Sequence, residues 1–218
     1  MRVKICGIRN ETELEAAVAS GADAVGFLVG QVHPSIDFIL PGTAARLVRR
    51  LPPGVSPVIV THLTEPDEIL ELVDRTGITT LQLHGGSTPE QVRAVRDALP
   101  PAAKLIVTLH LTSENDFVKA LDFYSAADAF LSDSFDAEKG KVGGTGKTHD
   151  WNLVRRFRDY SKLPVILAGG LGPDNVADAV RTVQPYAVDA NSRLKNAEGS
   201  VDPALCAAFV AAARSVQP

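Results

Sequence analysis

The sequence predicts a single parallel (β/α)8 barrel, and three observations lead to this fold class. Short β-branched or apolar runs recur at intervals of roughly twenty to thirty residues, the length of one strand, one helix and two loops. Each run is nearly continuously apolar, as expected for strands covered on both faces. Segments with helical periodicity separate the runs. Because the repeat is even and the chain has only 218 residues, a closed barrel is favoured over an open doubly wound sheet.

Eight strands and eight helices are expected in strict alternation. The strands are expected at residues 3–8, 24–29, 57–63, 79–84, 104–109, 129–133, 164–168 and 186–190. The helices are expected at residues 11–20, 43–51, 66–76, 89–99, 114–125, 151–160, 173–182 and 203–216. In the first helix, apolar Leu14, Ala17 and Val18 share one face. No domain boundary is apparent, so residues 1–218 are expected to form one domain.

Polar residues and glycines mark the ends of these helices. Five side chains near helix starts can accept hydrogen bonds from unpaired backbone N–H groups. They are Thr12, Thr43, Thr64, Thr88 and Asp150. Three glycines follow helix ends, where a left-handed backbone conformation is needed. They are Gly21, Gly54 and Gly77.

The composition points to a small-molecule ligand. The formal net charge is −4 and the basic residues are scattered, which argues against nucleic-acid or anionic-membrane partners. No apolar run is long enough to span a bilayer and the first residues do not read as a signal peptide, so a cytoplasmic location is expected. Cys6 and Cys206 give no disulfide framework and are expected to be free thiols.

Glycine-rich segments after the last three strands indicate a phosphate site. In a parallel barrel the active site lies at the carboxyl ends of the strands, and phosphate usually binds after strands seven and eight. Gly169 and Gly170 follow the seventh strand, and Asn191 and Ser192 follow the eighth. The loop at residues 140–150, which includes Gly144, Thr145 and Gly146, fits neither a P-loop nor a dinucleotide-binding pattern. Taken alone it is equally compatible with a flexible surface loop, but the joint placement favours phosphate.

Two ionisable residues form a candidate acid and base pair. Cys6 ends the first strand and Asp133 ends the sixth, so both are expected in the mouth of the barrel. The alternatives are a small buried thiol and a loop cap. His62, His84 and His110 end strands three to five, with His33 and Asp37 after strand two. Their spacing matches no metal motif, so substrate contacts or satisfied rim positions are favoured over a metal site.

At these residues the sequence resembles the phosphoribosylanthranilate isomerase family of tryptophan biosynthesis. The resemblance covers most of the chain in order and spacing. The matching segments are KICGI at residues 4–8, GADAVGF at 21–27, LQLHG at 81–85, DS at 133–134, GGTGKTHDW at 143–151, ILAGGL at 166–171 and VD at 188–189.

The resemblance implies a cofactor-free Amadori rearrangement, in which a phosphoribosyl aminoaldose becomes an aminoketose. Asp133 would be the general acid that protonates the ring oxygen, and Cys6 would be the general base that removes the C2′ proton. A thiolate suits this task if its pKa is lowered toward working pH. Four further residues are expected to contact the substrate. They are Lys4, Arg9, His84 and Asp189.

The sequence departs from the family in three places. After strand two the family's Ser-Pro-Arg becomes His33-Pro34-Ser35, which removes the arginine expected near the anthranilate carboxylate. His62 replaces an apolar residue at the end of strand three. After strand eight, the family's Ser-Ser-Gly becomes Asn191-Ser192-Arg193. Arg9 and Arg193 are the candidate replacements for the missing cation.

Three hypotheses therefore remain, and an isomerase acting on phosphoribosylanthranilate leads. A phosphosugar isomerase with another aglycone is the second, with His33, His62 and Asp37 in a metal or proton-transfer site. The third is a binding protein that has lost turnover, against which the presence of Cys6 and Asp133 argues. Each is compatible with a monomer or a homodimer.

Overall fold

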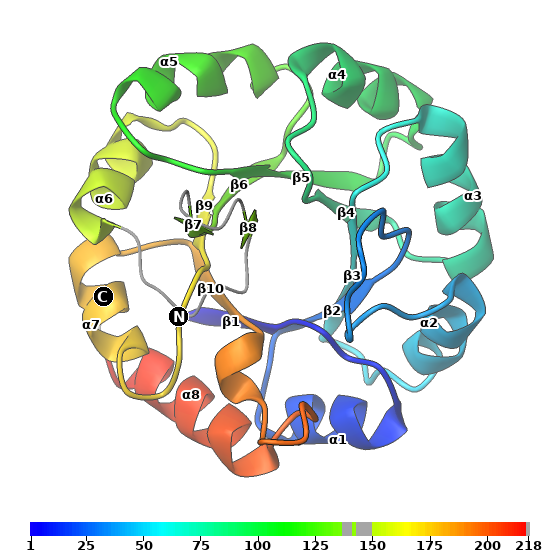
Figure 1. Cartoon of the computed structure of the whole chain (residues 1–218), viewed down its shortest axis with the longest axis vertical. Coiled ribbons are helices and arrows are strands. Elements are labelled where there is room, and N and C mark those ends of the chain that lie inside the picture. The colour runs from blue at the N-terminus through cyan, green and yellow to red at the C-terminus, as the bar shows by residue number, and fades with distance from the viewer. Residues whose placement is uncertain (137–140, 143–149, 217–218) are drawn as a thin grey trace.

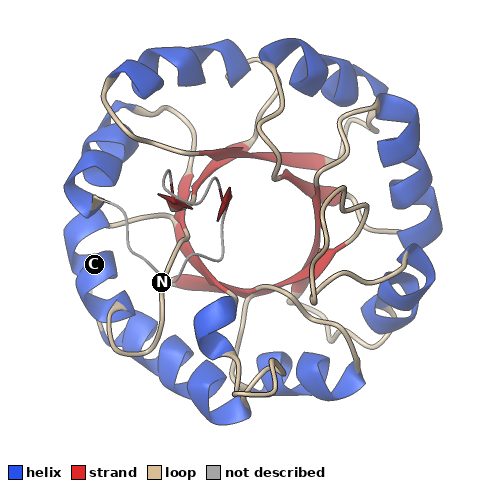
Figure 2. Cartoon of the chain, in the orientation of Figure 1, coloured by secondary structure: helices blue, strands red, loops and turns tan. Residues whose placement is uncertain are grey.

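A closed barrel of parallel strands is the centre of the molecule. The computed structural model describes residues 1–136, 141–142 and 150–216, and within them eight parallel strands form the barrel. Figure 2 shows this ring of strands inside a ring of helices. In chain order the strands are β1 (Arg2–Ile5), β2 (Ala24–Leu28), β3 (Ser56–Thr61), β4 (Thr80–Leu83), β5 (Lys104–Leu109), β6 (Ala129–Ser132), β9 (Val165–Leu167) and β10 (Ala187–Ala190). Each pairs with its neighbour in sequence, and β10 closes the ring on β1, which confirms the predicted fold.

Helices cover the outside of the barrel (Figure 1). Among the described residues they are α1 (Glu11–Ala19), α2 (Pro41–Val48), α3 (Pro66–Thr76), α4 (Pro89–Ala98), α5 (Asn115–Ala120), α6 (Trp151–Tyr160), α7 (Val176–Val183) and α8 (Pro203–Ser215). Short 3-10 helices follow α5 and β10, as η1 (Leu121–Phe123) and η2 (Ser192–Leu194). A two-stranded antiparallel hairpin, β7 (Phe135–Asp136) with β8 (Lys141–Val142), was not predicted. None of the described helices is both long and apolar enough to cross a membrane.

Side chains alternate between two buried layers because successive strand residues point to opposite faces. Val3 and Ile5 belong to the larger apolar cluster, between the barrel and its helices. Cys6, Val58 and Ile166 belong to a smaller cluster that fills the barrel interior. Residues that alternate with Val3 and Ile5, such as Lys4 and Cys6, therefore point into the barrel. Those near the carboxyl end of a strand reach the open end of the barrel.

Several elements end earlier or begin elsewhere than predicted. The first strand ends at Ile5 because Gly7 adopts φ +79°, and the Gly7 N–H donates to the Gly26 carbonyl at 3.0 Å. The second helix is α2, shifted toward the N-terminus because Pro41 occupies its first turn. The seventh helix begins only after Asn175, whose side chain bonds the Gly170 carbonyl and the Gly172 N–H in the preceding turn.

Two of the predicted helix caps are confirmed. Thr88 forms a capping box at α4, and Asp150 accepts two backbone hydrogen bonds at α6. The other three are wrong: Asn10 caps α1 in place of Thr12, Thr43 lies inside α2, and α3 begins after Glu65. The three glycines all have positive φ, and Gly77 is the left-handed C-cap of α3 as predicted. Gly21 and Gly54 have φ values of +88° and +95°.

The α1 cap gives a test of the helix start. Asn10→Ala should lower the free energy of unfolding by about 1 kcal/mol, because the Glu13 N–H loses the side-chain acceptor that it meets at 3.0 Å. Thr12→Ala, an exposed change inside the same helix, should leave it nearly unchanged. Chemical denaturation of both variants measures the difference. Equal losses would contradict the assignment of the cap to Asn10.

Candidate active site

A buried ion pair joins the first and last strands of the barrel. The Lys4 Nζ donates to the Asp189 Oδ2 at 2.7 Å, and the two side chains are 5% and 8% exposed. The pair forms because the strand register places Lys4 directly opposite Asp189, both facing inward. Burial lowers the pKa of Lys4, but the Asp189 carboxylate and Cys6 outweigh it and the net pKa is raised. Lys4 is therefore an ammonium inside the barrel.

Cys6 lies beside this ion pair at the end of β1. A methyl group on Gly26 would stand 2.6 Å from the Cys6 Sγ, so the glycine provides the space for the thiol. Burial raises the pKa of Cys6 to about 11, Lys4 opposes this, and Asp189 and Asp37 add to it. The condition set above for a thiolate base, a thiol pKa lowered toward working pH, is thus not met in this structure, because burial and two nearby carboxylates outweigh one ammonium.

Gln82 and His84 extend the polar contacts across the barrel on β4. Gln82 is fully buried, and its Oε1 accepts from the Lys4 Nζ at 2.9 Å. Its Nε2 lies 3.2 Å from the His84 Nδ1, and the Thr108 hydroxyl lies 3.3 Å from the same nitrogen. Burial lowers the pKa of His84 to about 3, and His110, His62 and Lys4 contribute in the same direction. His84 is therefore a neutral imidazole.

Asp133 stands at the far end of this set of contacts. Its Oδ2 is 3.6 Å from the His84 Nε2, and its Oδ1 accepts from the Ser134 N–H at 2.7 Å. Gly169 permits this arrangement: it has φ +83°, and a Cβ there would stand 2.9 Å from the Asp133 Oδ1. Asp189, Lys4, Gln82, His84 and Asp133 thus form one buried chain of polar side chains, which we call the polar network.

The predicted rim histidines lie side by side. Ring centroids are 5.7 Å apart for His33 and His62, 6.0 Å for His62 and His84, and 6.4 Å for His84 and His110. In the described part of the chain, no group of three or more His, Cys, Asp or Glu side chains is placed to hold a metal ion. Asp37 instead pairs with Lys195 and accepts from Asn191 Nδ2 at 2.9 Å.

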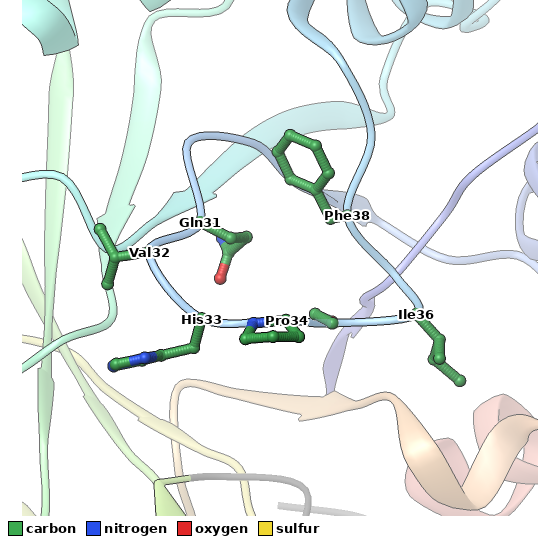
Figure 3. Close-up of a pocket in the computed structure, with 7 residues that line it drawn as sticks. Gln31, Val32, His33, Pro34, Ile36 and Phe38 are labelled. Atoms are coloured by element: carbon green, nitrogen blue, oxygen red, sulfur yellow. The ribbon is translucent and has the colours of Figure 1, made fainter.

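The loop after β2 forms an open pocket of its own. Its volume is about 590 Å³, and residues 31–36 and 38 line it (Figure 3). The Ser35 hydroxyl accepts from the Asp37 N–H at 3.2 Å, which bends the loop back on itself. Apolar Ile36 and Val32 are 72% and 59% exposed, so the surface of the loop is largely apolar.

The predicted phosphate residues come together only in part. Gly169 and Gly170 both adopt positive φ directly after β9, as a close backbone approach requires. Arg193 lies against this turn, with its Nη1 3.0 Å from the Gly170 carbonyl and its Nη2 2.7 Å from Asp174. Ser192 opens η2, directly after Asn191. Gly144, Thr145 and Gly146 lie outside the described residues.

Arg9 and Arg193, the candidate replacements for the arginine missing after β2, both already form ion pairs. Arg9 pairs with the buried Glu13 carboxylate and donates to the Gly199 carbonyl at 2.7 Å. Arg193 pairs with Asp174. Neither guanidinium is an uncompensated charge, so each would have to exchange a partner to bind an anion.

Sequence reasoning missed three residues that hold the site together. Gln82 and Thr108 contact His84, and Lys195 pairs with Asp37. The sequence did carry a signal for Gln82: it is a polar residue within an apolar strand, two positions before His84, so both side chains point to the same face. Lys195 had no such signal, because its contact joins two loops 158 residues apart.

A closed parallel barrel with a thiol, a carboxyl and an imidazole at the carboxyl ends of its strands defines a (β/α)8-barrel enzyme. Residues 3–212 match the family model described as N-(5′-phosphoribosyl)anthranilate (PRA) isomerase. The chain therefore belongs to the N-(5′-phosphoribosyl)anthranilate isomerase family, and the isomerase class expected from the resemblance is confirmed.

Individual relatives agree along the whole chain. N-(5′-phosphoribosyl)anthranilate isomerase 2 of Methanosarcina mazei is 41% identical over 215 residues, covering 99% of this chain and 95% of that protein. The enzyme of Methanothrix thermoacetophila is 38% identical over 216 residues, covering 99% of each. The crystal structure from Thermotoga maritima superposes with a TM-score of 0.85 at 34% identity, covering 99% of this chain and all of that one.

The space around Cys6 gives a prediction. Gly26→Ala should lower the free energy of unfolding by about 1–3 kcal/mol, because its new methyl group overlaps the Cys6 sulfur and the Lys4 stem. Gly42→Ala on the exposed side of α2, where nothing lies within 4 Å, is the matched control and should be neutral or stabilising. Denaturation curves measure both, and an equal response of the two variants would refute this packing role.

The pKa of Cys6 can be tested by alkylation in a Cys206→Ser background. With a pKa of about 11, the rate should keep rising tenfold per pH unit from neutrality to about pH 10, because only the thiolate reacts. Mass spectrometry of the alkylated protein over time gives the rate. A plateau near the ordinary thiol pKa would show that the site does not suppress ionisation.

Proposed function

We propose that this protein isomerises N-(5′-phosphoribosyl)anthranilate to the 1-deoxyribulose-5-phosphate aminoketose, with Asp133 as general acid and Cys6 as general base. Family membership supports the reaction. A similar structure, with a TM-score of 0.82 and 32% identity, is a complex with reduced 1-(o-carboxyphenylamino)-1-deoxyribulose 5-phosphate. The observation that carries the assignment is that the polar network connects the two groups: Lys4 lies beside Cys6, and Asp133 faces His84 at the other end of the network. The proposed acid and base thus both follow barrel strands at their carboxyl ends, beside the same network.

Ring opening is the first step. The Asp133 carboxyl gives its proton to the furanose ring oxygen, and the C1′–O bond breaks with its electron pair going to that oxygen. The lone pair of the anthranilate nitrogen forms the C1′=N bond, which leaves an iminium cation. The Ser134 N–H then stabilises the Asp133 carboxylate through the Oδ1, where the two groups are 2.7 Å apart.

Proton removal from C2′ is the second step. The Cys6 thiol first releases its proton to solvent, and the thiolate then takes the C2′ proton. The C2′–H electrons form the C1′=C2′ bond, and the iminium electrons return to nitrogen. The resulting enaminol becomes the ketone when C1′ gains a proton and the C2′ hydroxyl loses one. A sulfur with a high pKa is a strong base, and the adjacent iminium charge favours its ionised form. The reaction is an internal redistribution of hydrogen and requires no cofactor.

The remaining substrate contacts follow from the site. The turn at Gly169 and Gly170, with Asn191 and Ser192, would bind the phosphate together with Gly144, Thr145 and Gly146. Lys4, His84 and Asp189 would contact the ribose from within the polar network. Arg9 lies near the Ile36 carbonyl, 3.5 Å from its Nη1, and would act at the aglycone end.

A steady-state assay with freshly generated phosphoribosylanthranilate tests the proposal. Cys6→Ser and Asp133→Asn should each lower kcat by about 10²–10⁴-fold, because each removes one proton-transfer group. Cys206→Ser changes a buried thiol in α8 and is the control, with activity expected near wild type. Undetectable turnover by folded wild-type protein that still binds inorganic phosphate would overturn the proposed function.

A second candidate is the same rearrangement on a substrate without the anthranilate carboxylate. The loop after β2 favours it, because Ser35 is uncharged and its hydroxyl is bonded to the Asp37 N–H. The phosphoribosyl adduct of aniline distinguishes the two. A kcat/KM for anthranilate at least tenfold above that for aniline supports carboxylate recognition, since one charged hydrogen bond is worth about 1.5–3 kcal/mol. Equal values support the second candidate.

A further inference from the structure

The contact between Lys4 and Gln82 determines how the Gln82 amide is oriented. An ammonium group only donates hydrogen bonds, so the amide oxygen must face it. The Gln82 Oε1 is 2.9 Å from the Lys4 Nζ, in agreement with this requirement. The reversed amide would bring an NH₂ group against the ammonium inside a buried site. The Gln82 Nε2 is therefore committed to the opposite side, toward His84.

This orientation in turn determines where His84 carries its proton. The Gln82 Nε2 lies 3.2 Å from the His84 Nδ1, and an amide nitrogen only donates. The Nδ1 must therefore accept, which places the proton of the neutral ring on Nε2. The Thr108 hydroxyl, 3.3 Å from the same Nδ1, can also donate to it.

The surroundings of His84 favour the neutral ring as well. An imidazolium would turn an Nδ1–H toward the Gln82 NH₂ group, two donors facing one another. Burial holds the pKa of His84 at about 3, and His110, His62 and Lys4 act in the same direction. A carboxylate at Asp133, whose Oδ2 is 3.6 Å from the His84 Nε2, would favour the charged imidazolium instead. Asp189, at the other end of the polar network, pairs with Lys4 at 2.7 Å.

We propose that Gln82 is a positioning residue that holds His84 in its neutral Nε2–H tautomer and thereby directs an N–H donor at the Asp133 carboxylate. The distance of 3.6 Å is longer than a hydrogen bond, so the donor approaches without yet binding. The tautomer assignment stands on this chain's own contacts. Its consequence for catalysis rests on the proposed function, in which Asp133 becomes a carboxylate after giving up its proton.

The consequence is that the carboxylate formed in the first step meets two donors. The Ser134 N–H holds the Oδ1, and the His84 Nε2–H faces the Oδ2. Both favour the ionised form over the protonated one and so favour release of the proton to the ring oxygen. Gln82 would exert this effect without touching the substrate, through Lys4 on one side and His84 on the other.

Gln82→Glu is the informative variant, because a carboxylate of nearly the same shape can still accept from Lys4 but cannot donate to His84. The His84 Nδ1 should then become protonated and donate to the new carboxylate. Long-range ¹H–¹⁵N NMR of protein labelled with ¹⁵N-histidine distinguishes the two ring nitrogens, and His84→Asn assigns the signal. Wild type should show a protonated Nε2 and an unprotonated Nδ1 near neutral pH.

Two further variants serve as controls. Gln91→Glu adds the same charge at a capping position of α4, where glutamate also fits, and should leave the His84 signals unchanged. Thr108→Val removes the second contact to the Nδ1, and the tautomer should persist because Gln82 still donates. In the assay, Gln82→Glu should lower kcat by at least tenfold with a smaller effect on KM.

The outcomes separate this inference from the proposed function. A wild-type His84 with its proton on Nδ1 overturns the inference, whether or not any variant folds. An unchanged tautomer in folded Gln82→Glu also overturns it, as does a tautomer that reverses in Thr108→Val. The expected tautomer with no wild-type turnover supports the role of Gln82 in orienting His84 and contradicts the proposed reaction instead.

Discussion

The buried ion pair of Lys4 and Asp189 is the interaction on which the site depends. Two charges inside a barrel are costly to desolvate, and here each is compensated by the other. Lys4 also donates to the Gln82 Oε1, whereas the buried Asp189 Oδ1 has no hydrogen-bond partner among the described residues. The pairing of β1 with β10 brings them to 2.7 Å at the seam where the barrel closes. The strand pairing that closes the barrel therefore also brings together the two charged residues of the site.

Everything else in the polar network takes its orientation from this pair. Lys4 orients the Gln82 amide, the amide orients His84, and His84 faces Asp133. The same pair shapes the environment of Cys6, where Lys4 favours ionisation and Asp189 opposes it. Internal charges of this kind distinguish the protonation of two groups that burial alone would treat alike.

The loop after β2 uses its polar groups to bind other parts of the protein. Its polar residues bind the protein itself: Ser35 bonds the Asp37 N–H, and Asp37 bonds Asn191 and Lys195. Its exposed residues are largely apolar, and His33 lies beside His62 at the rim. The loop that would hold the aglycone therefore differs in chemistry from the charged part of the site around Lys4. It is in this loop, at residues 33–35, that the chain departs from the family pattern.

The sequence by itself determined the alternation of strands and helices, the barrel, and the positions of Cys6 and Asp133 at strand ends. These follow from local periodicity and from the rule that parallel barrels place their sites at the carboxyl ends of strands. Helix caps were predicted less well, as Thr12 and Asn10 show, because neighbouring polar residues compete for the same N–H groups and only backbone geometry selects one.

Only the tertiary structure decided the roles of Gln82 and Lys195 and the raised pKa of Cys6. Hydrogen-bond direction, burial and the sum of nearby charges depend on residues far apart in the chain. Lys4 and Asp189 are 185 positions apart, and their pairing exists only once the barrel has closed. A pattern of residue types predicts which groups reach the mouth, whereas their protonation depends on what surrounds them in space.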